Sequence, residues 1–392
     1  MKTHSASRRK LLQAMAAAPL AASIPSLAVE SKPNRLLVLV YLYGGNDCYN
    51  TWVPYTNEIY PQIRPTIAIP RDSVIKVTDS HGFHPSLAPL MSMWEAKELA
   101  LVQGIGYATG TQQHFRDSDT AFTGYDGQEY SVDGWVSRAL AKRARSGGED
   151  AIAFDMLDVR EADPMGPFRG GELGAVQVFY ASDLLGSRHM DESVYQANAR
   201  GRASLAGYPN ALPAVPLKTT FPTDPFGAAM RAAVELASID RALPVIHVAL
   251  NGLNEDKHHS VDCHWDQLKY HGDALARLAN GLAALRSGLQ EIGRWDETLV
   301  ATYDEFGRCP TENEDHGTHH GLASVHFVMG GRVKGGLVGE APEVRDMFPH
   351  IGGPMPVIDT RRLWTTVAQQ WWNVDTSALF SKRYAALDLL RA

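Results

Sequence analysis

Acidic and histidine side chains of this 392-residue chain gather directly after runs of apolar residues. Carboxylates and imidazoles are ligands that zinc, manganese and iron accept, so these clusters predict a divalent metal site. The chain has no Walker-type Gly-Lys motif, no G-x-G-x-x-G, no G-x-S-x-G and no H-E-x-x-H. This disfavours a phosphate-binding loop, a serine hydrolase elbow and a zincin helix. The candidate segments are Gly44–Asp47, Thr111–Phe115, Asp262–His264, Asp304–Arg308 and His316–His320.

Each of these segments also has a purely structural interpretation. Gly44–Asp47 has the composition of a turn that ends in a capping aspartate, and Asp262–His264 fits a surface turn. Glu305 and Arg308 fit a structural ion pair. The segment His316–His320 fits a solvated loop. Each signal is weak by itself, and their combination favours a functional site.

Short apolar runs predict the strands that would position these segments. Leucine or isoleucine at every third or fourth position between 275 and 292 predicts an amphipathic helix, and residues 360–372 predict another. The predicted strands are 35–43, 98–103, 244–250, 298–303 and 324–329. Strands that alternate with helices indicate an α/β fold, with a mostly parallel sheet and helices on both faces. Because ligands bind beyond the carboxyl ends of parallel strands, we expect the polar segments to converge there.

The middle of the chain differs from this pattern. Residues 160–225 are richer in Gly, Pro and Ser and have weak periodicity. We interpret them as an elaborated insertion or cap over the sheet rather than a linker. Residues 29–392 are therefore expected to form a single domain.

The N-terminal segment 1–28 has the features of an export signal. Arg8 and Arg9 precede two leucines, a 14-residue apolar stretch reaches Ile24, and small residues around Ala28 fit a cleavage site. The pattern resembles a twin-arginine (Tat) signal, which predicts a periplasmic or secreted protein. An amphipathic N-terminal helix is the alternative.

Composition and charge exclude several classes of partner. The net charge is −7, and the four basic residues of segment 1–28 have no acidic counterpart, so the remainder is more acidic still. An acidic chain gives no basic surface for nucleic acid and favours cation binding. No apolar run approaches the ~20 residues that a membrane-spanning helix needs, so we expect no stable membrane insertion.

The three cysteines each adjoin one of the candidate segments. They are Cys48, Cys263 and Cys309. A thiolate ligand, a disulfide or a thiol-dependent redox role is possible in an oxidising compartment. The alternative is that each fills a small buried position beside its motif.

The order of the motifs carries a family resemblance. It runs GGND, QHF, DCHWDQ, TLVATYDEFGR, GTHHG, VMGGRVKGG and IDTRRLWTTVAQQWW. With this order the sequence resembles the bacterial Tat-exported family called domain of unknown function 1501, over nearly all of the chain after residue 28. That family is regarded as a relative of the alkaline phosphatase and sulfatase superfamily. The resemblance implies an alkaline-phosphatase-like three-layer α/β/α sandwich with a metal site at the strand ends, but no established activity.

The resemblance also implies a ligand set. Asp47 falls where the superfamily places its first metal-binding aspartate, and Asp262 and His264 match a D-x-H motif of the family. Glu305 matches its E-F-G-R motif, and His320 matches the end of its G-T-D-H-G motif. The expected cofactor is a divalent ion such as zinc or manganese, and the expected ligands are Asp47, Asp262, His264, Glu305 and His320.

Three further residues are candidates for catalysis. Arg308 would bind an anionic oxygen in bidentate fashion, and His114 would act as general acid or substrate contact. Thr111 is the hydroxyl nearest to the nucleophile position of the superfamily, although it is out of register. The chain departs from the family at Gln113, where Ser or Thr is common, and at His319, where Asp is usual.

Two functions follow as hypotheses. The first is an exported metal-dependent hydrolase of phosphate, sulfate or related esters, with a small-molecule or polymer-borne anionic ester as substrate. The alternative is an exported, catalytically inactive binding or assembly protein that retains the hydrolase fold. The sequence makes no prediction about the oligomeric state.

Overall fold

The computed structural model describes most of the chain after residue 34. The described ranges are 35–125, 133–141, 151–155, 166–170, 176–180, 215–240, 242–250, 261–345 and 353–391. The predicted export signal 1–28 lies outside them. The export signal and the domain boundary at residue 28 therefore stay predictions.

A nine-stranded sheet forms the centre of the described fold, in the order β13-β5-β12-β9-β1-β8-β6-β7, with β14 paired to β5. Its strands are β1 (Leu36–Tyr41), β5 (Leu99–Gly106), β6 (Ala151–Asp155), β7 (Val176–Tyr180), β8 (Val245–Ala249), β9 (Thr298–Tyr303), β12 (Ser324–Met329), β13 (Gly336–Gly339) and β14 (Ile358–Asp359). All five predicted strands are present. The strands β6, β7, β13 and β14 were not predicted; β7 and β13 lie at the edges of the sheet, and β14 has only two residues.

The sheet is mostly parallel, as expected. β1 pairs in parallel with β8 on one side and β9 on the other. β12 is antiparallel to both β5 and β9, so β5 and β9 point in the same direction. The carboxyl ends of β1, β5, β8 and β9 therefore lie along one edge of the sheet.

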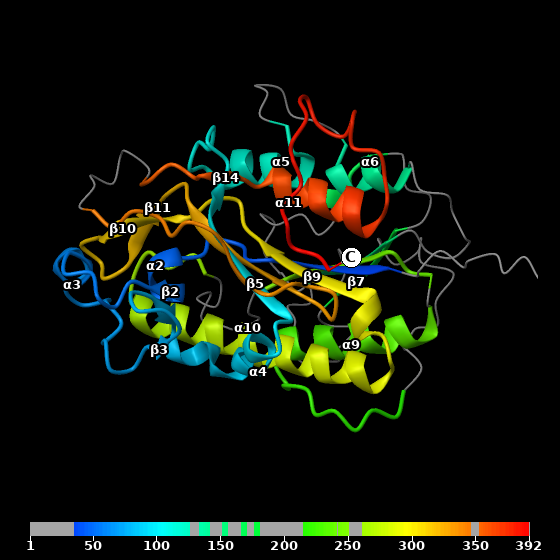
Figure 1. Ribbon diagram of the computed structural model, residues 1–392, viewed down its shortest axis with the longest axis horizontal. Coiled ribbons are helices and arrows are strands. Elements are labelled where there is room, and N and C mark those ends of the chain that lie inside the picture. The colour runs from blue at the N-terminus through cyan, green and yellow to red at the C-terminus, as the bar shows by residue number, and fades with distance from the viewer. Residues whose placement is uncertain are drawn as a thin grey trace, which may run out of the picture. The chain divides into compact units, whose positions relative to one another are not determined.

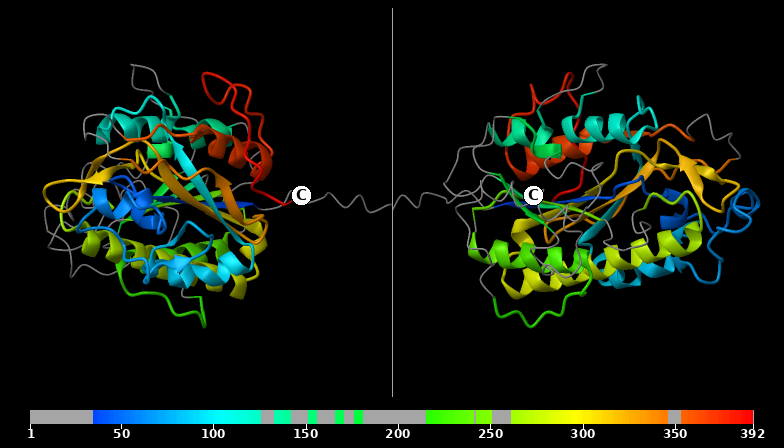
Figure 2. Two further views of the ribbon diagram at one scale, coloured as in Figure 1. Left: turned by 60° about the vertical axis from the view of Figure 1, so that its left-hand side comes forward. Right: turned by 180° about the vertical axis from the view of Figure 1, so that it is seen from behind.

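Helices cover both faces of this sheet, which gives the three-layer α/β/α arrangement (Figures 1 and 2). The helices on one face are α4 (Met91–Glu95), α9 (Pro225–Ile239) and α10 (Gln267–Glu291). Those on the other are α5 (His114–Thr123), α6 (Trp135–Ala141) and α11 (Arg361–Thr365), which continues as the π-helical turn η6 (Thr366–Trp371). The predicted sandwich is confirmed.

Alternating side chains of β1 contribute to two separate cores. Leu36 and Val38 pack with α9 and α10, whereas Leu37 and Leu39 pack with the tryptophans of α6 and α11. A strand buried on both faces needs apolar residues at every position, and β1 has them from Leu36 to Tyr41. This is why the continuous apolar run identified β1 correctly.

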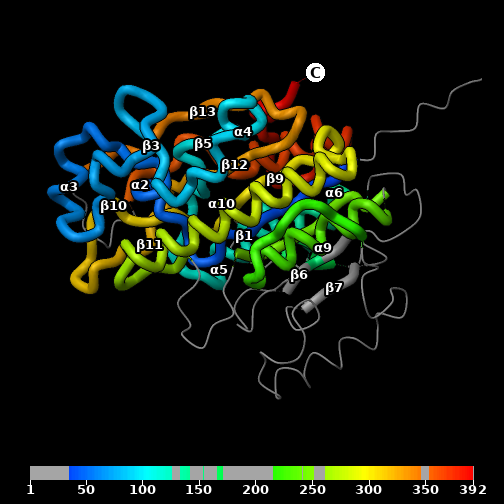
Figure 3. Tube along the Cα trace, turned by 90° about the horizontal axis from the view of Figure 1, so that it is seen from below, coloured from blue at the N-terminus to red at the C-terminus, as the bar shows by residue number. Residues whose placement is uncertain are grey.

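Helix α10 begins eight residues before the predicted apolar stripe. Figure 3 shows α9 and α10 next to each other across one face of the sheet. Leu275, Leu278 and Leu282 face the core, as the periodicity predicts. The first turns of α10 instead bury the polar residues Gln267 and His271. The apolar pattern therefore missed the start of the helix, since that end of the helix contributes to a polar network.

Smaller elements complete the region around the sheet edge. A two-stranded sheet pairs β10 (Arg308–Glu312) with β11 (Thr318–His320), so that Arg308 lies opposite His320. A three-stranded sheet contains β2 (Trp52–Val53), β3 (Ile75–Lys76) and β4 (Gly82–Phe83). Short helices are α2 (Cys48–Thr51), α3 (Tyr60–Ile63), η1 (Pro85–Leu90), η2 (Gly166–Phe168) and η4 (Trp295–Glu297).

Only parts of the predicted insertion 160–225 are described. Within it, β7 is the edge strand of the main sheet and pairs in parallel with β6. This part of the region extends the sheet. Among the helices of the described ranges, none has the length and apolar character needed to cross a membrane.

Candidate metal centre

Four side chains from three segments converge beyond the carboxyl ends of the central strands. They are His114, Asp262, His264 and His320, and their ligand atoms all lie within 4.8 Å of one another. His114 is the first residue of α5, His320 ends β11, and Asp262 and His264 follow β8 in the chain. Their side chains are between 17% and 30% exposed, so solvent reaches the site.

The three histidines direct Nε2 at the same carboxylate. His264 Nε2 lies 3.1 Å and His320 Nε2 lies 3.6 Å from Asp262 Oδ1. The two Nε2 atoms of His264 and His320 are 2.9 Å apart. His114 approaches the other oxygen, with Nε2 3.6 Å from Asp262 Oδ2. A carboxylate with imidazole nitrogens around it is a donor set that zinc, manganese and iron accept, so the residues fit a divalent cation.

Hydrogen bonds on the far side of two imidazoles fix how they are oriented. His114 Nδ1 lies 2.9 Å from Glu305 Oε1, and His320 Nδ1 lies 2.8 Å from the carbonyl oxygen of Gln112. Carboxylate and carbonyl oxygens only accept, so each Nδ1 carries the hydrogen and donates it. Histidines that bind metals through Nε2 commonly have this kind of partner on the other nitrogen.

Charges in the cluster shift the pKa values of its members. Burial would raise the pKa of the Asp262 carboxyl, but His264, His320 and Arg308 lower it well below its usual range. Burial would lower the pKa of His114, but the bond to Glu305 and the charge of that residue raise it. Burial lowers the pKa of His320, and Arg308 lowers it further. The cluster therefore holds an ionised carboxylate beside histidines of different basicity.

The N–H groups of Arg308 have partners within the protein. Nε donates to the Gly45 carbonyl at 3.1 Å, and Nη2 donates to the Gly44 carbonyl and to Asp262. Nη1 donates to the Thr318 carbonyl at 2.9 Å and lies 3.4 Å from His264 Nε2. Carbonyl and carboxylate oxygens therefore accept from four of the five N–H donors of the guanidinium. This geometry favours a role in positioning Asp262 over the predicted bidentate binding of an anion.

Glu305 lies behind His114, outside the group of converging ligand atoms. Its Oε1 accepts from the Gly44 backbone N–H at 2.8 Å as well as from His114. Glu305 is 1% exposed. The geometry therefore places it as the partner of His114 rather than of Arg308, and its direct ligand role stays a prediction.

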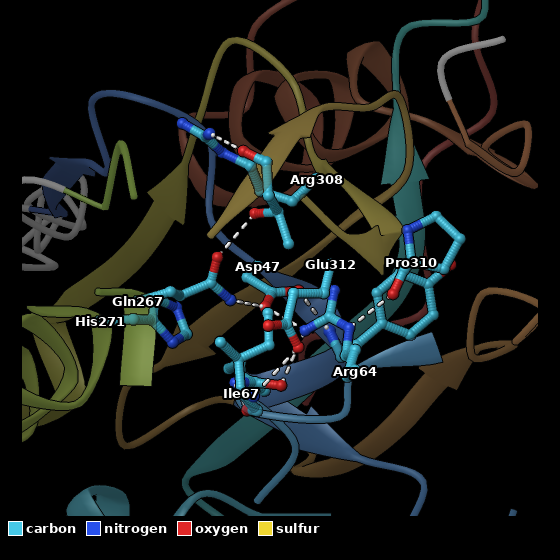
Figure 4. A network of polar contacts seen from close by, with 12 residues as sticks. Asp47, Arg64, Ile67, Gln267, His271, Arg308, Pro310 and Glu312 are labelled. Atoms are coloured by element: carbon cyan, nitrogen blue, oxygen red, sulfur yellow. Dashed lines mark hydrogen bonds and ion pairs between the residues drawn. The ribbon is translucent and has the colours of Figure 1, made fainter. Parts of the chain in front are cut away.

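Asp47 lies in a buried network with Arg64 and Gln267 (Figure 4). Its Oδ1 accepts from the Tyr49 backbone N–H at 3.0 Å and caps α2, and both oxygens bind Arg64, with Nη1–Oδ2 at 2.5 Å and Nη2–Oδ1 at 3.1 Å. Gln267 Nε2 also donates to Asp47. Burial would raise the pKa of the Asp47 carboxyl, but Arg64 lowers it. The structure thus keeps Asp47 apart from the converging histidines, although the resemblance implied a ligand.

The third catalytic candidate, Thr111, also has an internal partner. Its hydroxyl donates to Asp117 Oδ1 at 2.9 Å. His319 lies beside His320 in the chain but is 38% exposed and does not join the cluster. The structure therefore brings together four predicted site residues and places Glu305 and Arg308 against them.

The three cysteines are buried thiols, and no disulfide links them. Burial raises the pKa of Cys263 to about 12 and that of Cys309 to about 11. Burial likewise raises the pKa of Cys48 well above its usual range. The packing interpretation is therefore favoured over the disulfide and the thiolate.

Sequence reasoning missed Arg64, Asp117 and the carbonyl of Gln112. Arg64 follows α3 and belongs to no recognisable motif. Asp117 lies in the first turn of α5, where an acidic residue is common for helix stability alone. A backbone carbonyl has no sequence signature at all, so only the structure reveals the partner of His320.

Comparisons with known proteins connect the sequence to one family. Residues 189–377 match the family model described as protein of unknown function (DUF1501). The family resemblance is confirmed. The matched range contains Asp262, His264, Glu305 and His320 and ends before the chain does, while His114 lies outside it. None of the curated proteins is significantly similar to the sequence.

Several solved structures are similar to this chain at low sequence identity and low TM-score. The lipoteichoic acid synthase LtaP from Listeria monocytogenes is 10% identical with a TM-score of 0.38, and the match covers 78% of this chain and 66% of LtaP. The PsFucS1 sulfatase from Pseudoalteromonas sp. is 8% identical with a TM-score of 0.41, and the match covers 90% of this chain and 70% of the sulfatase. The phosphonate monoester hydrolase of Agrobacterium radiobacter is 14% identical with a TM-score of 0.35, and the match covers 75% of this chain and 68% of the hydrolase. The chain thus spans just under two thirds of LtaP, and this degree of likeness assigns no substrate.

The buried pair of Asp47 and Arg64 yields a stability prediction. Replacing Arg64 with Met leaves Asp47 buried without its cation, so the free energy of unfolding should fall by about 3–5 kcal/mol. The matched control is Lys334→Met, which removes an ion pair whose partner Asp388 is 86% exposed. That variant should lose only about 0–1 kcal/mol. Urea unfolding measures both, and equal losses would contradict the prediction.

Proposed function

We propose that this chain is a metal-dependent hydrolase of phosphate, sulfate or related esters. The observation that carries the proposal is the convergence of Asp262 and His264 from one loop and His320 from β11 on one point that solvent reaches. The family resemblance and its relation to the alkaline phosphatase and sulfatase superfamily support an anionic ester as substrate. That ester would be a small molecule or part of a polymer.

Asp262, His264 and His320 would hold the cation, zinc or manganese being suited to this donor set. Three protein ligands leave a position for substrate or water, as is usual in catalytic zinc sites. The bound cation would supply Lewis-acid polarisation of the ester and activation of water. Arg308 would keep Asp262 in place, since its Nη2 donates to that carboxylate.

His114 is proposed as the general acid that protonates the leaving oxygen. It lies against Asp262 Oδ2, whereas His264 and His320 lie against Oδ1. Glu305 accepts the Nδ1 hydrogen, which directs Nε2 towards the reaction centre. An imidazole supported in this way can carry a proton and deliver it at Nε2.

Metal binding is the first test. Replacing His264 with Ala removes one donor, so the Zn²⁺ affinity should fall by more than the 10–100-fold that loss of an outer partner typically costs. Competition with a chromophoric chelator measures the affinity. The control His319→Ala alters a histidine in the adjacent loop that does not join the cluster, and it should bind Zn²⁺ like the wild type. Equal affinities for all three proteins would overturn the assignment of the site.

Hydrolysis separates the role of His114 from metal binding. With Zn²⁺ or Mn²⁺ bound, 4-nitrophenyl phosphate and 4-nitrophenyl sulfate are the probe esters. His114→Ala should keep most of its metal affinity and lose about 10²–10⁴-fold in kcat, because it removes a general acid. A variant that loses metal and activity together would make His114 a ligand instead.

The alternative is a binding or assembly protein that has lost catalysis. The engaged hydroxyl of Thr111 and the four N–H groups of Arg308 that donate to protein oxygens favour it, since these groups face a substrate only after rearrangement. Zn²⁺ binding without turnover of either probe ester would support this alternative.

We also propose export to the periplasm or beyond by the Tat pathway, on the twin arginine and the apolar stretch of segment 1–28. Replacing Arg8 and Arg9 with Lys preserves charge but removes the arginine pair, so the precursor should stay uncleaved in the cytoplasm. Cell fractionation and N-terminal sequencing of the mature chain measure this. Lys2→Arg is the control and should be exported normally. Normal export of the double variant would refute the Tat assignment.

A further inference from the structure

A glutamine in an unusual backbone conformation lies two residues before helix α5. Gln112 has φ +60°, in the left-handed region that residues other than Gly, Asn and Asp seldom adopt. Such a conformation persists when surrounding contacts enforce it, and these cases cluster at functional sites. Contacts with surrounding residues must therefore hold Gln112 in this conformation.

Asp117 supplies the contacts that enforce this conformation. Its Oδ1 accepts from the Thr111 backbone N–H at 2.8 Å and from the Thr111 hydroxyl at 2.9 Å. Its Oδ2 accepts from the backbone N–H groups of Thr111 at 2.9 Å and Gln112 at 2.6 Å. Asp117 is only 2% exposed, so these bonds are protected from water. One buried carboxylate thus fixes two consecutive peptide units.

The fixed loop directs the Gln112 carbonyl at a histidine far away in the chain. That oxygen lies 2.8 Å from His320 Nδ1. A carbonyl oxygen can only accept, so the contact is favourable when Nδ1 carries the hydrogen. In the other neutral tautomer, two lone pairs would face each other. The loop therefore favours the form of His320 whose Nε2 lone pair lies on the side of Asp262 and His264.

We propose that Asp117 and the left-handed Gln112 form a positioning device that holds His320 in the Nδ1–H tautomer. Asp117 is a positioning residue, since it acts through the Gln112 backbone and does not touch the converging atoms. The same carboxylate also organises the residues that immediately precede His114. The significance of the tautomer for metal binding rests on the proposed function, whereas the tautomer itself does not.

If the contacts of Asp117 only stabilised the loop and α5, disrupting them would leave the tautomer of His320 unchanged. The matched pair of variants at Gln112 tests the difference. Asn tolerates the left-handed region, so Gln112→Asn should preserve the direction of the carbonyl. Val is β-branched and strongly disfavours positive φ, so Gln112→Val should turn the carbonyl away. Asp117→Asn, which replaces one accepting oxygen by an N–H₂ group, removes the enforcing contacts from the other side.

The measurement is ¹⁵N NMR of the imidazole nitrogens in the metal-free full chain, with the His320 signals assigned by their loss in His320→Gln. We expect the Nδ1–H form in the wild type and in Gln112→Asn, and a mixture of tautomers in Gln112→Val and Asp117→Asn. The Zn²⁺ affinity of Gln112→Val and of Asp117→Asn should fall by about 10–100-fold, the usual cost of losing the partner of a metal-binding histidine.

A wild-type tautomer in both Gln112→Val and Asp117→Asn would overturn the proposal, as would loss of the tautomer in Gln112→Asn. If Asp117→Asn fails to fold, the two variants at Gln112 decide by themselves. If the wild type binds no Zn²⁺, the proposed function fails, while the NMR comparison still tests the positioning of His320.

Discussion

The buried guanidinium of Arg308 is the interaction on which the candidate site depends. It binds the carbonyls of Gly44 and Gly45 after β1, the carbonyl of Thr318 in β11, and the carboxylate of Asp262 after β8. A buried cation costs several kcal/mol in lost hydration unless its hydrogen bonds and a counter-charge compensate. Arg308 has both kinds of compensation. It therefore joins three segments that the sheet only brings near one another.

A second buried network continues from the first. The Thr318 hydroxyl donates to Gln267 Oε1 at 2.7 Å, and Gln267 in turn donates to Asp47, which pairs with Arg64. The two guanidiniums therefore lie at opposite ends of one continuous chain of hydrogen bonds. Breaking any buried member would leave an unsatisfied polar group, so the network specifies the geometry of the loops more strictly than apolar packing would. The polar start of α10 is the part of that helix that serves this network.

The sequence predicted the fold better than the roles of single residues. The apolar run of β1 and the leucine stripe of α10 report burial directly, so both were identified from composition and spacing. The motif order likewise located Asp262, His264 and His320. Asp47 shows the limit of such predictions, because a carboxylate after a strand has the same sequence pattern whether it binds a metal ion or a guanidinium. Tertiary packing brings its partner Arg64 into contact, and no local sequence pattern predicts that contact.

What the sequence by itself determined is therefore the alternation of strands and helices and the acid–histidine character of the loops at the strand ends. These follow from local burial and from residue type. Only the tertiary structure decided which side chains meet: the histidines around Asp262, Glu305 behind His114, and the Gln112 carbonyl behind His320. Hydrogen bonds between segments some 200 residues apart depend on distance in space to within an ångström. Spacing along a chain does not encode such distances.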